Sequence, residues 1–215
     1  MDISDFSTDF FSLAGRTAIV TGGNGGLGRA FSVALAAAGA NVFVPSLADD
    51  DGETARMVEQ HGRSYAFRQS DITADGEPER MVRACVEEFG GVDVLVNSAG
   101  INLLSDDVVA FDRAKWDPMI AVNLPAAFDF ARASAAVMIP NGRGKIINIA
   151  SLFSFLGGRQ SPAYAASKAG IVGFTKAYAD ELGEFGIQVN AVAPGYFATA
   201  LTEKTRSDAE ADRRI

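Results

Sequence analysis

Cysteine and histidine are almost absent from this sequence, which contains one of each, Cys85 and His61. A single cysteine forms no disulfide within the chain, so we expect a reducing, cytoplasmic compartment. Without a second histidine or a cysteine cluster there is no case for a metal site, and we expect none. No apolar run approaches the roughly 20 residues that span a bilayer. The stretch from Met1 to Asp9 also lacks the basic residues that begin a secretory signal, so we expect no membrane partner.

Positive charge is scarce as well. The chain carries 19 Lys and Arg against 27 Asp and Glu, a formal net charge of −8. Nucleic acid is bound by clustered Lys and Arg, so this balance argues against it as a partner. A small molecule remains compatible with the charge, because one local arginine can hold an anion. With 215 residues, 48% of them hydrophobic, the chain suits a single domain over residues 1–215.

From Arg16 onward, short β-branched apolar runs alternate with longer amphipathic runs. The short runs predict strands at Thr17–Val20, Asn41–Val44, Ser64–Arg68, Val92–Val96, Lys145–Ile149 and Gln188–Val192. The longer runs predict helices at Leu27–Ala38, Gly52–Gln60, Pro78–Phe89, Arg113–Val137 and Ala163–Glu184. This alternation implies right-handed crossovers and a parallel sheet. We therefore predict the α/β class, as a single Rossmann-type domain whose parallel sheet has helices on both faces.

A glycine-rich turn connects the first expected strand to the first expected helix. It reads Thr21-Gly22-Gly23-Asn24-Gly25-Gly26-Leu27-Gly28. Glycines permit a tight turn and let the backbone approach a pyrophosphate, whose charge is favoured at a helix N-terminus. A structural loop is the alternative, but the position on the first strand of an alternating chain favours a dinucleotide site.

Several ordered motifs resemble the short-chain dehydrogenase/reductase family over essentially the whole chain. The turn has that family's spacing, Gly22-x3-Gly26-x-Gly28, and Asp71 follows the third expected strand. Asn97-Ser98-Ala99-Gly100 is similar to the family's N-N-A-G element, with serine in second place. The later motifs, in the family's order, are Asn123, Ser151, Tyr164-x3-Lys168 and Pro194-Gly195.

The resemblance implies a nicotinamide cofactor and a set of residues that contact it. That set is Gly22, Asn24, Gly26, Leu27, Gly28, Ser46, Asp71, Ile72, Asn97, Ala99, Gly100, Tyr164, Lys168, Pro194, Gly195 and Thr199. Ser46 occupies the position of the family's NAD-selecting aspartate, and no arginine follows it. Gly25 stands where many NADP enzymes of the family carry a basic residue. Since the Asp49–Asp51 run would repel an additional phosphate, we expect NAD, with NADP as the alternative.

The expected reacting groups lie on one helix. Ser161-Pro162 predicts a helix start, which places Tyr164 and Lys168 four residues apart on one face. Lowering a phenol pKa from about 10 to near 7 requires about 4 kcal/mol, which the Lys168 ammonium and an oxidised nicotinamide would supply. Tyr164 then acts as general base or acid, and Ser151 hydrogen-bonds the same substrate oxygen. By resemblance, Asn123 holds a water that links Lys168 to solvent.

Each of these residues also has a structural interpretation. A tyrosine and a lysine four residues apart are a common surface pair on helices. Ser151 could cap a helix, and Asn123 could satisfy buried backbone groups. The joint occurrence of all four behind the glycine turn is what favours catalysis.

Within the family, three segments look like sugar-acid dehydrogenases: Asp9–Leu13, Lys115–Met119 and Ser151–Gly158. This implies hydride transfer at one secondary alcohol or ketone of a 2-deoxy-D-gluconate or 2-dehydro-3-deoxy-D-gluconate type of substrate. We expect substrate contacts from Ser151, Phe153, Arg159 and Tyr164. Arg159 would pair with the substrate carboxylate, although a solvated surface arginine is the alternative. Phe153 could equally pack against the core.

Two other functions remain open at this point. A 3-oxoacyl-carrier-protein reductase of the same family would prefer NADP and need a basic surface for its acidic carrier. A catalytically silent nucleotide-binding regulator would keep the fold without turnover. Family members usually continue through a lid, a helix and a last strand, so we expect those parts to be missing after the segment Ala198–Ile215. The resemblance also implies a homotetramer packed through the two long helices.

Overall fold

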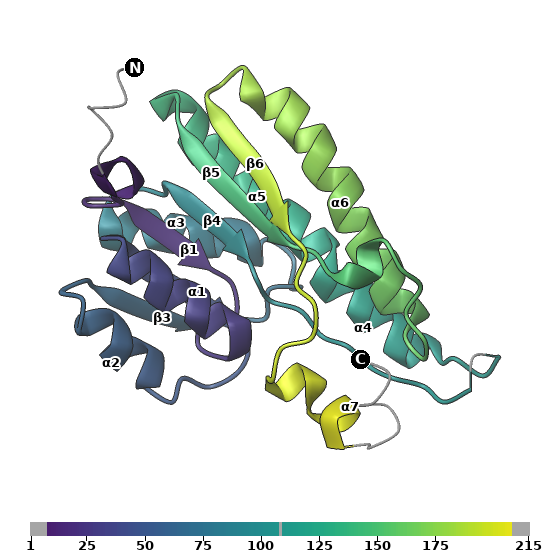
Figure 1. Ribbon diagram of the computed structural model, residues 1–215. Helices are drawn as coiled ribbons and strands as arrows, with labels where there is room; N and C mark the ends of the chain where they lie inside the picture. The colour runs from purple at the N-terminus through teal and green to yellow at the C-terminus, as the bar shows by residue number, and fades with distance from the viewer. Residues whose placement is uncertain (1–7, 108, 208–215) are drawn as a thin grey trace.

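Six parallel strands form one sheet in the order β3-β2-β1-β4-β5-β6 (Figure 1). This is a computed structural model, and it describes residues 8–107 and 109–207. The part of the expected lid after Ser207 lies outside the described residues. The strands are β1 Thr17–Val20, β2 Asn41–Ser46, β3 Tyr65–Gln69, β4 Val94–Asn97, β5 Gly144–Ile149 and β6 Ile187–Val192. The α/β class and the parallel sheet predicted from the sequence are confirmed.

Helices cover both faces of the sheet, and Figure 1 shows α1 and α2 in front of it with α3 and α5 behind. The α-helices are α1 Gly26–Ala37, α2 Glu53–Glu59, α3 Glu77–Phe89, α4 Arg113–Asn123, α5 Pro125–Met138, α6 Pro162–Gly183 and α7 Glu203–Ser207. Short 3₁₀ turns are η2 Thr8–Phe11, η3 Ile139–Asn141, η4 Leu152–Ser154 and η5 Ala200–Thr202. Among the described residues, none of the helices has the length and apolar character needed to cross a membrane.

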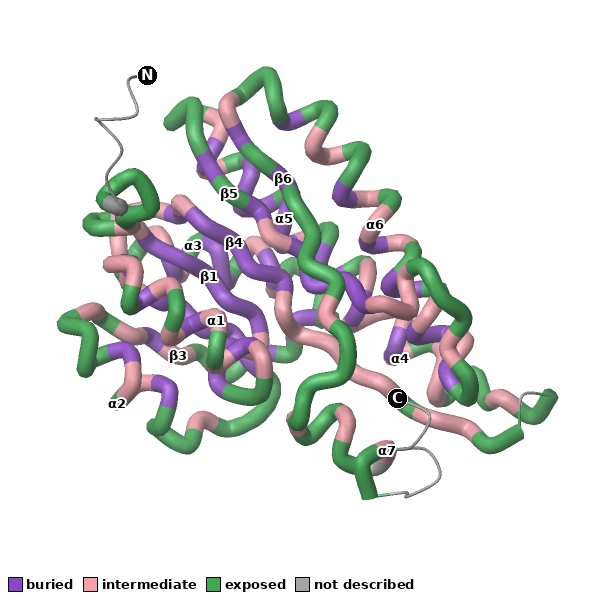
Figure 2. Tube along the Cα trace, in the orientation of Figure 1, coloured by how far each residue is buried: buried purple, intermediate pink, exposed green. Residues whose placement is uncertain are grey.

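Alternate side chains of the central strands build two hydrophobic cores. Ile19, Phe43 and Leu95 pack toward α3, α5 and α6. Val20 and Val44 belong to the other core, together with residues of α1 and α2. Figure 2 shows this burial along β1 and β4, whereas β6 is largely exposed. β2 is buried from Val42 to Ser46. The near-continuous apolar strands noted in the sequence are therefore explained by burial on both faces.

One expected helix is divided in the structure. The sequence predicts a single helix at Arg113–Val137, but α4 ends at Asn123 and α5 begins at Pro125. Leu124 between them has φ −129° and ψ −66°, outside the helical region. The cause is local, because Pro125 has no N–H to donate and its ring disfavours helical geometry in the preceding residue. The break fixes the end of α4 at Asn123.

The order in which strands are added to the sheet reverses between β1 and β4. β1 pairs with β2 on one side and with β4 on the other, so the crossovers run opposite ways. Open α/β sheets bind ligands beyond the carboxyl ends of the strands at this point. Thr21, Asn97, Ala150 and Ala193 end or follow β1, β4, β5 and β6 at that edge.

Candidate active site

The glycine turn after β1 is packed so tightly that Gly22, Gly23 and Gly28 leave no room for another residue. Gly22 has φ +64°, in the left-handed region that glycine adopts readily. A Cβ on Gly28 would lie 2.2 Å from the carbonyl oxygen of Gly22, so a larger residue would push the turn open. Leu27 follows Gly26 in the first turn of α1, and its side chain is half-buried. The turn is thus a fixed backbone cradle at the start of a helix.

The N-terminus of α1 offers free space in front of its backbone. Gly25 is the N-cap residue and no side chain caps the helix. Gly25 is exposed, and a Cβ added to it would meet no atom within 4 Å. On the opposite side, the Thr199 side chain lies 3.7 Å from where a Cβ on Gly26 would be. Uncapped N–H groups beside open space fit a pyrophosphate between the glycine turn and Thr199.

Thr21 joins the glycine turn to the loop after β4. Its hydroxyl oxygen accepts the N–H groups of Ser98 and Ala99, each at 3.0 Å. A Cβ on Gly22 would approach the Cα of Ala99 to 3.3 Å, which shows how closely the two segments meet. Thr21 was not identified from the sequence as a site residue, although it stands first in the glycine motif. It is a positioning residue for two predicted cofactor segments.

The loop after β2 is held in place from the glycine turn. The buried Asn24 side chain donates to the carbonyl oxygens of Ala48 and Asp49, at 3.1 and 3.0 Å. The side-chain N–H groups of Asn24 are therefore used in hydrogen bonds within the protein. Ser46 is buried and its carbonyl accepts the N–H of Ser70, while Leu47 is exposed. These positions form the expected adenosine end of the site.

Charges around this loop are mostly paired within the protein. Arg29, one residue after Gly28, donates to Asp51 at 2.6 Å and pairs with Glu53. Asp71 accepts both the N–H and the hydroxyl of Thr73, and these bonds lower the pKa of its carboxyl group. Ile72 beside it is buried.

The loop after β4 lies between the two predicted halves of the site. Asn97 donates to Ala127 O at 3.0 Å and to Asn148 Oδ1 at 2.8 Å, which ties β4 to β5 below the loop. A Cβ on Gly100 would lie 3.2 Å from Asn123 Oδ1 and 3.5 Å from Lys168 Nζ. Glycine at position 100 therefore lets the cofactor loop approach the predicted catalytic groups.

Tyr164 and Lys168 lie together in the first turns of α6. Both are buried, with 9% and 4% of their surfaces exposed, and Lys168 Nζ is 5.6 Å from the centre of the Tyr164 ring. Ser161 precedes the helix as predicted, but its hydroxyl makes no cap and donates instead to Asn102. Pro162 is the first helical residue, which fits its fixed φ. The predicted shared face is confirmed by this geometry.

Burial shifts both groups toward their neutral forms. Desolvation lowers the pKa of Lys168 to about 8. Its ammonium donates to the carbonyl oxygen of Ile149 at 2.6 Å. Desolvation also raises the pKa of the Tyr164 phenol, an effect that the Ser151 hydroxyl opposes and Tyr196 increases. A buried phenol beside a hydroxyl and an ammonium is suited to proton transfer once a further positive charge is nearby.

Asn123 is fixed by its own hydrogen bonds at the end of α4. Its Oδ1 accepts the N–H of Ile101, and its Nδ2 donates to Ile101 O, both at 2.9 Å. Nδ2 also donates to Ser167 Oγ at 3.2 Å, and that hydroxyl donates to Tyr164 O. The Asn123 amide thus links the loop after β4 to the turn that carries Tyr164.

Two aromatic rings continue from Tyr164 toward solvent. Phe153 makes edge contacts with Tyr164 at 6.1 Å and with Tyr196 at 6.2 Å between ring centres. Tyr196 follows Pro194-Gly195, where Pro194 O accepts the N–H of Leu152. Tyr196 was missed in the sequence analysis, because nothing local indicates that it reaches Phe153.

Arg159 lies in an exposed turn over this region. Its side chain has no ion pair or hydrogen bond with any residue in the described part of the chain. The next residue, Gln160, has φ +64°, and its side chain donates to Asp106 at 2.7 Å. Gln160 O also accepts the N–H of Ser105, so two hydrogen bonds join this turn to the loop after β4. Gln160 was not identified from the sequence.

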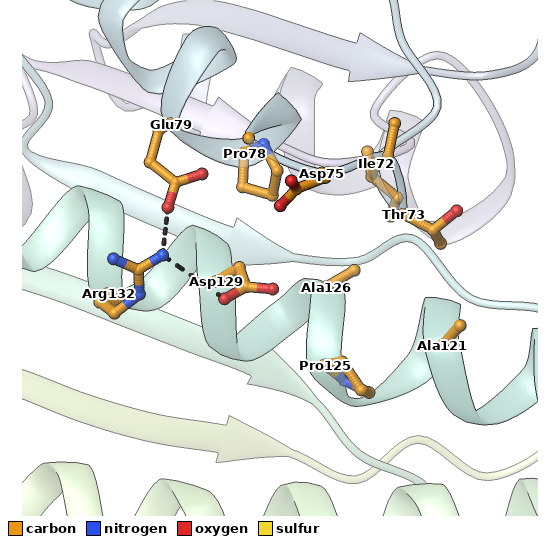
Figure 3. Close-up of a pocket in the computed structure, with 12 residues that line it drawn as sticks. Ile72, Thr73, Asp75, Pro78, Glu79, Ala121, Pro125, Ala126, Asp129 and Arg132 are labelled. Atoms are coloured by element: carbon orange, nitrogen blue, oxygen red, sulfur yellow. Dashed lines mark hydrogen bonds and ion pairs between the residues drawn. The ribbon is translucent and has the colours of Figure 1, made fainter.

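A pocket of about 300 Å³ lies away from Tyr164, between the loop after β3 and the α4–α5 junction. Figure 3 shows Arg132 reaching toward Glu79 and Asp129 at its rim. Of the predicted cofactor residues it contains Ile72. Tyr164 and Lys168 of α6 are not among the residues that line this pocket.

Comparison with known proteins agrees with this geometry. The family model for short chain dehydrogenase matches residues 16–210. The chain is 58% identical over 213 residues to the uncharacterized oxidoreductase YgcW of Escherichia coli K12, covering 99% of this chain and 81% of that protein. It is 41% identical over 209 residues to 2-dehydro-3-deoxy-D-gluconate 5-dehydrogenase of Bacillus subtilis 168, covering 96% and 81%.

A solved structure is similar in both sequence and fold. It is that of a putative 2-deoxy-D-gluconate 3-dehydrogenase from Agrobacterium tumefaciens with bound NADP. The TM-score is 0.86 and the identity 42%, over 95% of this chain and 80% of that one.

Proposed function

The chain belongs to the short chain dehydrogenase family, and on that premise we propose that it is an NAD-dependent sugar-acid dehydrogenase. Its membership makes it an oxidoreductase that uses a nicotinamide cofactor. The proposed substrate is a secondary alcohol or ketone of the 2-deoxy-D-gluconate or 2-dehydro-3-deoxy-D-gluconate type. The observation that carries the proposal is the burial of Tyr164 and Lys168 on one face of α6, beside Ser151.

We assign proton transfer to Tyr164. A bound nicotinamide supplies the acceptor or donor of the hydride. In oxidation, the Tyr164 phenolate takes the proton of the substrate hydroxyl, and in reduction the phenol returns it to the same oxygen. Burial alone raises the pKa of Tyr164, so the phenolate requires the positive charge that Lys168 places 5.6 Å from the ring. Since the pKa of Lys168 is about 8, most of it is charged at neutral pH.

Two further residues would position the reacting groups. Ser151 donates to that oxygen and orients it toward Tyr164. Asn123 keeps the loop at Ile101 and the first turns of α6 in register, and so positions both catalytic side chains. The proposed water between Lys168 and solvent would lie next to this junction.

The cofactor would lie along the carboxyl edge, from the loop after β2 to Thr199. Gly22, Gly26 and Gly28 receive the pyrophosphate, and the open space at Gly25 fits that group. NAD is favoured because Asp49, Asp50 and Asp51 follow β2, and because Arg29 is already paired with Asp51 and Glu53. The Agrobacterium relative contains NADP, which makes NADP the alternative. A comparison of kcat/KM for the two cofactors decides between them.

Arg159 and the aromatic rings of Phe153 and Tyr196 support an anionic polyhydroxylated substrate. The guanidinium of Arg159 is unpaired within the described chain and lies in the turn just before α6. It can bind a carboxylate through two parallel hydrogen bonds. Phe153 and Tyr196 offer flat surfaces against which the C–H faces of a sugar acid can pack. The name of the Bacillus subtilis relative is consistent with this substrate class.

The proposal is tested by turnover of sugar acids with each cofactor, measured by the absorbance of the reduced nicotinamide. The expected result is oxidation of a deoxygluconate, or reduction of its keto form, that Tyr164→Phe abolishes. NADPH-dependent reduction of 3-oxoacyl thioesters, without turnover of sugar acids, would favour an acyl reductase. Cofactor binding without turnover of either class would favour a silent regulator.

For the assembly, we propose a cytoplasmic homotetramer, as the family resemblance implies. The outer sides of α5 and α6 carry an aromatic cluster, in which Phe128 contacts Phe174 and Tyr178 at 5.8 Å each. Phe128 is 39% exposed, so packing against another copy would bury further apolar surface. Sedimentation equilibrium tests this assignment, and a monomer at micromolar concentration would contradict it.

A further inference from the structure

The hydroxyl group of Ser154 connects the main chains of two residues of the proposed catalytic set. It donates to the carbonyl oxygen of Lys168 at 2.7 Å and accepts the N–H of Ser151 at 3.2 Å. We propose that Ser154 is a positioning residue that holds the Ser151 hydroxyl against the Tyr164 phenol. This inference rests on the proposed function, since it concerns the same proton-transfer site.

The bond to Lys168 is not needed to complete the helix. Lys168 lies inside α6, where each carbonyl already accepts the N–H of the residue four positions later. The Ser154 hydroxyl is therefore an additional donor on a satisfied acceptor. Its effect is to join η4 to α6 at the turn that carries Lys168.

The bond to Ser151 completes a small closed arrangement. Ser151 Oγ accepts the N–H of Phe153 at 3.2 Å, and Ser154 Oγ accepts the N–H of Ser151, as in a capping box. Among the described residues, no other hydrogen bond joins residues 151–156 to the main chain of α6. The bond from Lys168 Nζ to Ile149 O holds α6 to the end of β5, but Ser154 supplies the direct hydrogen bond between η4 and the main chain of α6.

The consequence is chemical, because the Ser151 hydroxyl opposes the rise that burial causes in the pKa of the Tyr164 phenol. A displacement of about 1 Å in a reacting group can cost about 100-fold in rate. Replacing Ser154 with alanine removes both bonds and releases η4 from α6. We expect kcat to fall by about 10-fold or more while the cofactor Kd changes by less than about twofold. The limb of the pH profile that reports Tyr164 should move to higher pH.

Two variants separate positioning from general stability. Ser154→Thr keeps the hydroxyl and should recover most of kcat and the original pH profile. Thr175→Val is the matched control, because the Thr175 hydroxyl also donates to an α6 carbonyl, Ile171 O at 2.7 Å, and accepts one N–H, from Asn148 at 3.0 Å. Thr175→Val should lower the melting temperature and leave the pH profile unchanged.

A measurement that needs no substrate keeps this inference separate from the proposed function. Tyrosine labelled at the phenol carbon reports ionisation by NMR, and Tyr164→Phe identifies the Tyr164 signal. Ser154→Ala should raise the midpoint of that ionisation, with no change in Thr175→Val. A turnover that Tyr164→Phe abolishes but Ser154→Ala leaves within twofold, at an unchanged pH profile, overturns the role of Ser154. If wild-type protein turns over no sugar acid, the proposed function fails, and the NMR midpoint still decides the role of Ser154.

Discussion

The ammonium of Lys168 donates to the carbonyl oxygen of Ile149 at 2.6 Å, two residues before Ser151. This bond joins the interior of α6 to the end of β5, and it places a positive charge where both segments meet. Burial lowers the pKa of Lys168 to about 8 because the charged form is poorly solvated there. The protein therefore maintains a charge at the site at a cost to its own stability.

That cost predicts a pH dependence of stability. In the unfolded chain the pKa of Lys168 returns to 10.5, above its folded value of about 8, so the unfolded state binds its proton more tightly. Stability should accordingly rise with pH between those two values through this residue. Lys168→Met should lack this rise, so its stability relative to wild type should be greatest at neutral pH and should fall as the pH increases toward 10.5. Urea unfolding of the cofactor-free protein across this range measures it, and a constant difference between the two proteins would contradict the prediction.

Gly28 should tolerate no side chain. A Cβ there would lie 2.2 Å from Gly22 O, a backbone atom that cannot rotate away, so Gly28→Ala should destabilise the protein by about 1–3 kcal/mol and weaken cofactor binding. Gly25→Ala is the control, since its φ of −153° suits any residue and its Cβ would meet open space. That variant should lie within about 0.5 kcal/mol of wild type in thermal unfolding without cofactor. Equal losses in the two variants would show that the turn is not the constraint.

Thr21→Val should uncouple the glycine turn from the loop after β4. The variant keeps the shape of the side chain but leaves the N–H of Ala99 without its acceptor, which costs about 1–3 kcal/mol, whereas the N–H of Ser98 keeps Val96 O as an acceptor at 3.0 Å. Cofactor affinity should fall with stability, because both segments contribute to the proposed site. Thr17→Val serves as control, since the Thr17 hydroxyl makes no hydrogen bond within the described residues. Unchanged cofactor affinity by calorimetry in Thr21→Val would argue against the coupling.

Arg159→Ala should affect the substrate and not the chemistry. Loss of a bidentate contact of about 1.5–3 kcal/mol predicts a KM for sugar acids at least about 10-fold higher, with kcat nearly retained. Arg143→Ala, at the opposite end of β5 and paired with Asp93, is the control and should leave KM unchanged. Steady-state kinetics would refute the assignment if Arg159→Ala and wild type had the same KM, and a sugar lacking the carboxylate should show no difference between them.

Some features follow from residues that are close in the chain. The strand–glycine turn–helix unit at 17–37 depends on apolar runs and on glycines within a few positions, and it formed where the sequence indicated. The pairing of Tyr164 with Lys168 follows from the helical period. The break at Leu124 had a local cause too. Pro125 indicates a helix start, but the apolar pattern on both sides of it is continuous enough to suggest one long helix.

Other features depend on which segments the sheet brings together. Thr21 meets Ser98 and Ala99 because β1 and β4 are neighbours, and Phe153 meets Tyr196 because the segments after β5 and β6 share one edge. The Ser154 bond to Lys168 requires η4 to pack on α6. The sequence by itself determined the local elements, the cofactor turn and the spacing of the reacting pair, because neighbours along the chain govern backbone conformation. Only the tertiary structure decided which hydroxyls, amides and rings support them, because those partners are chosen by sheet order and packing between segments far apart in the chain.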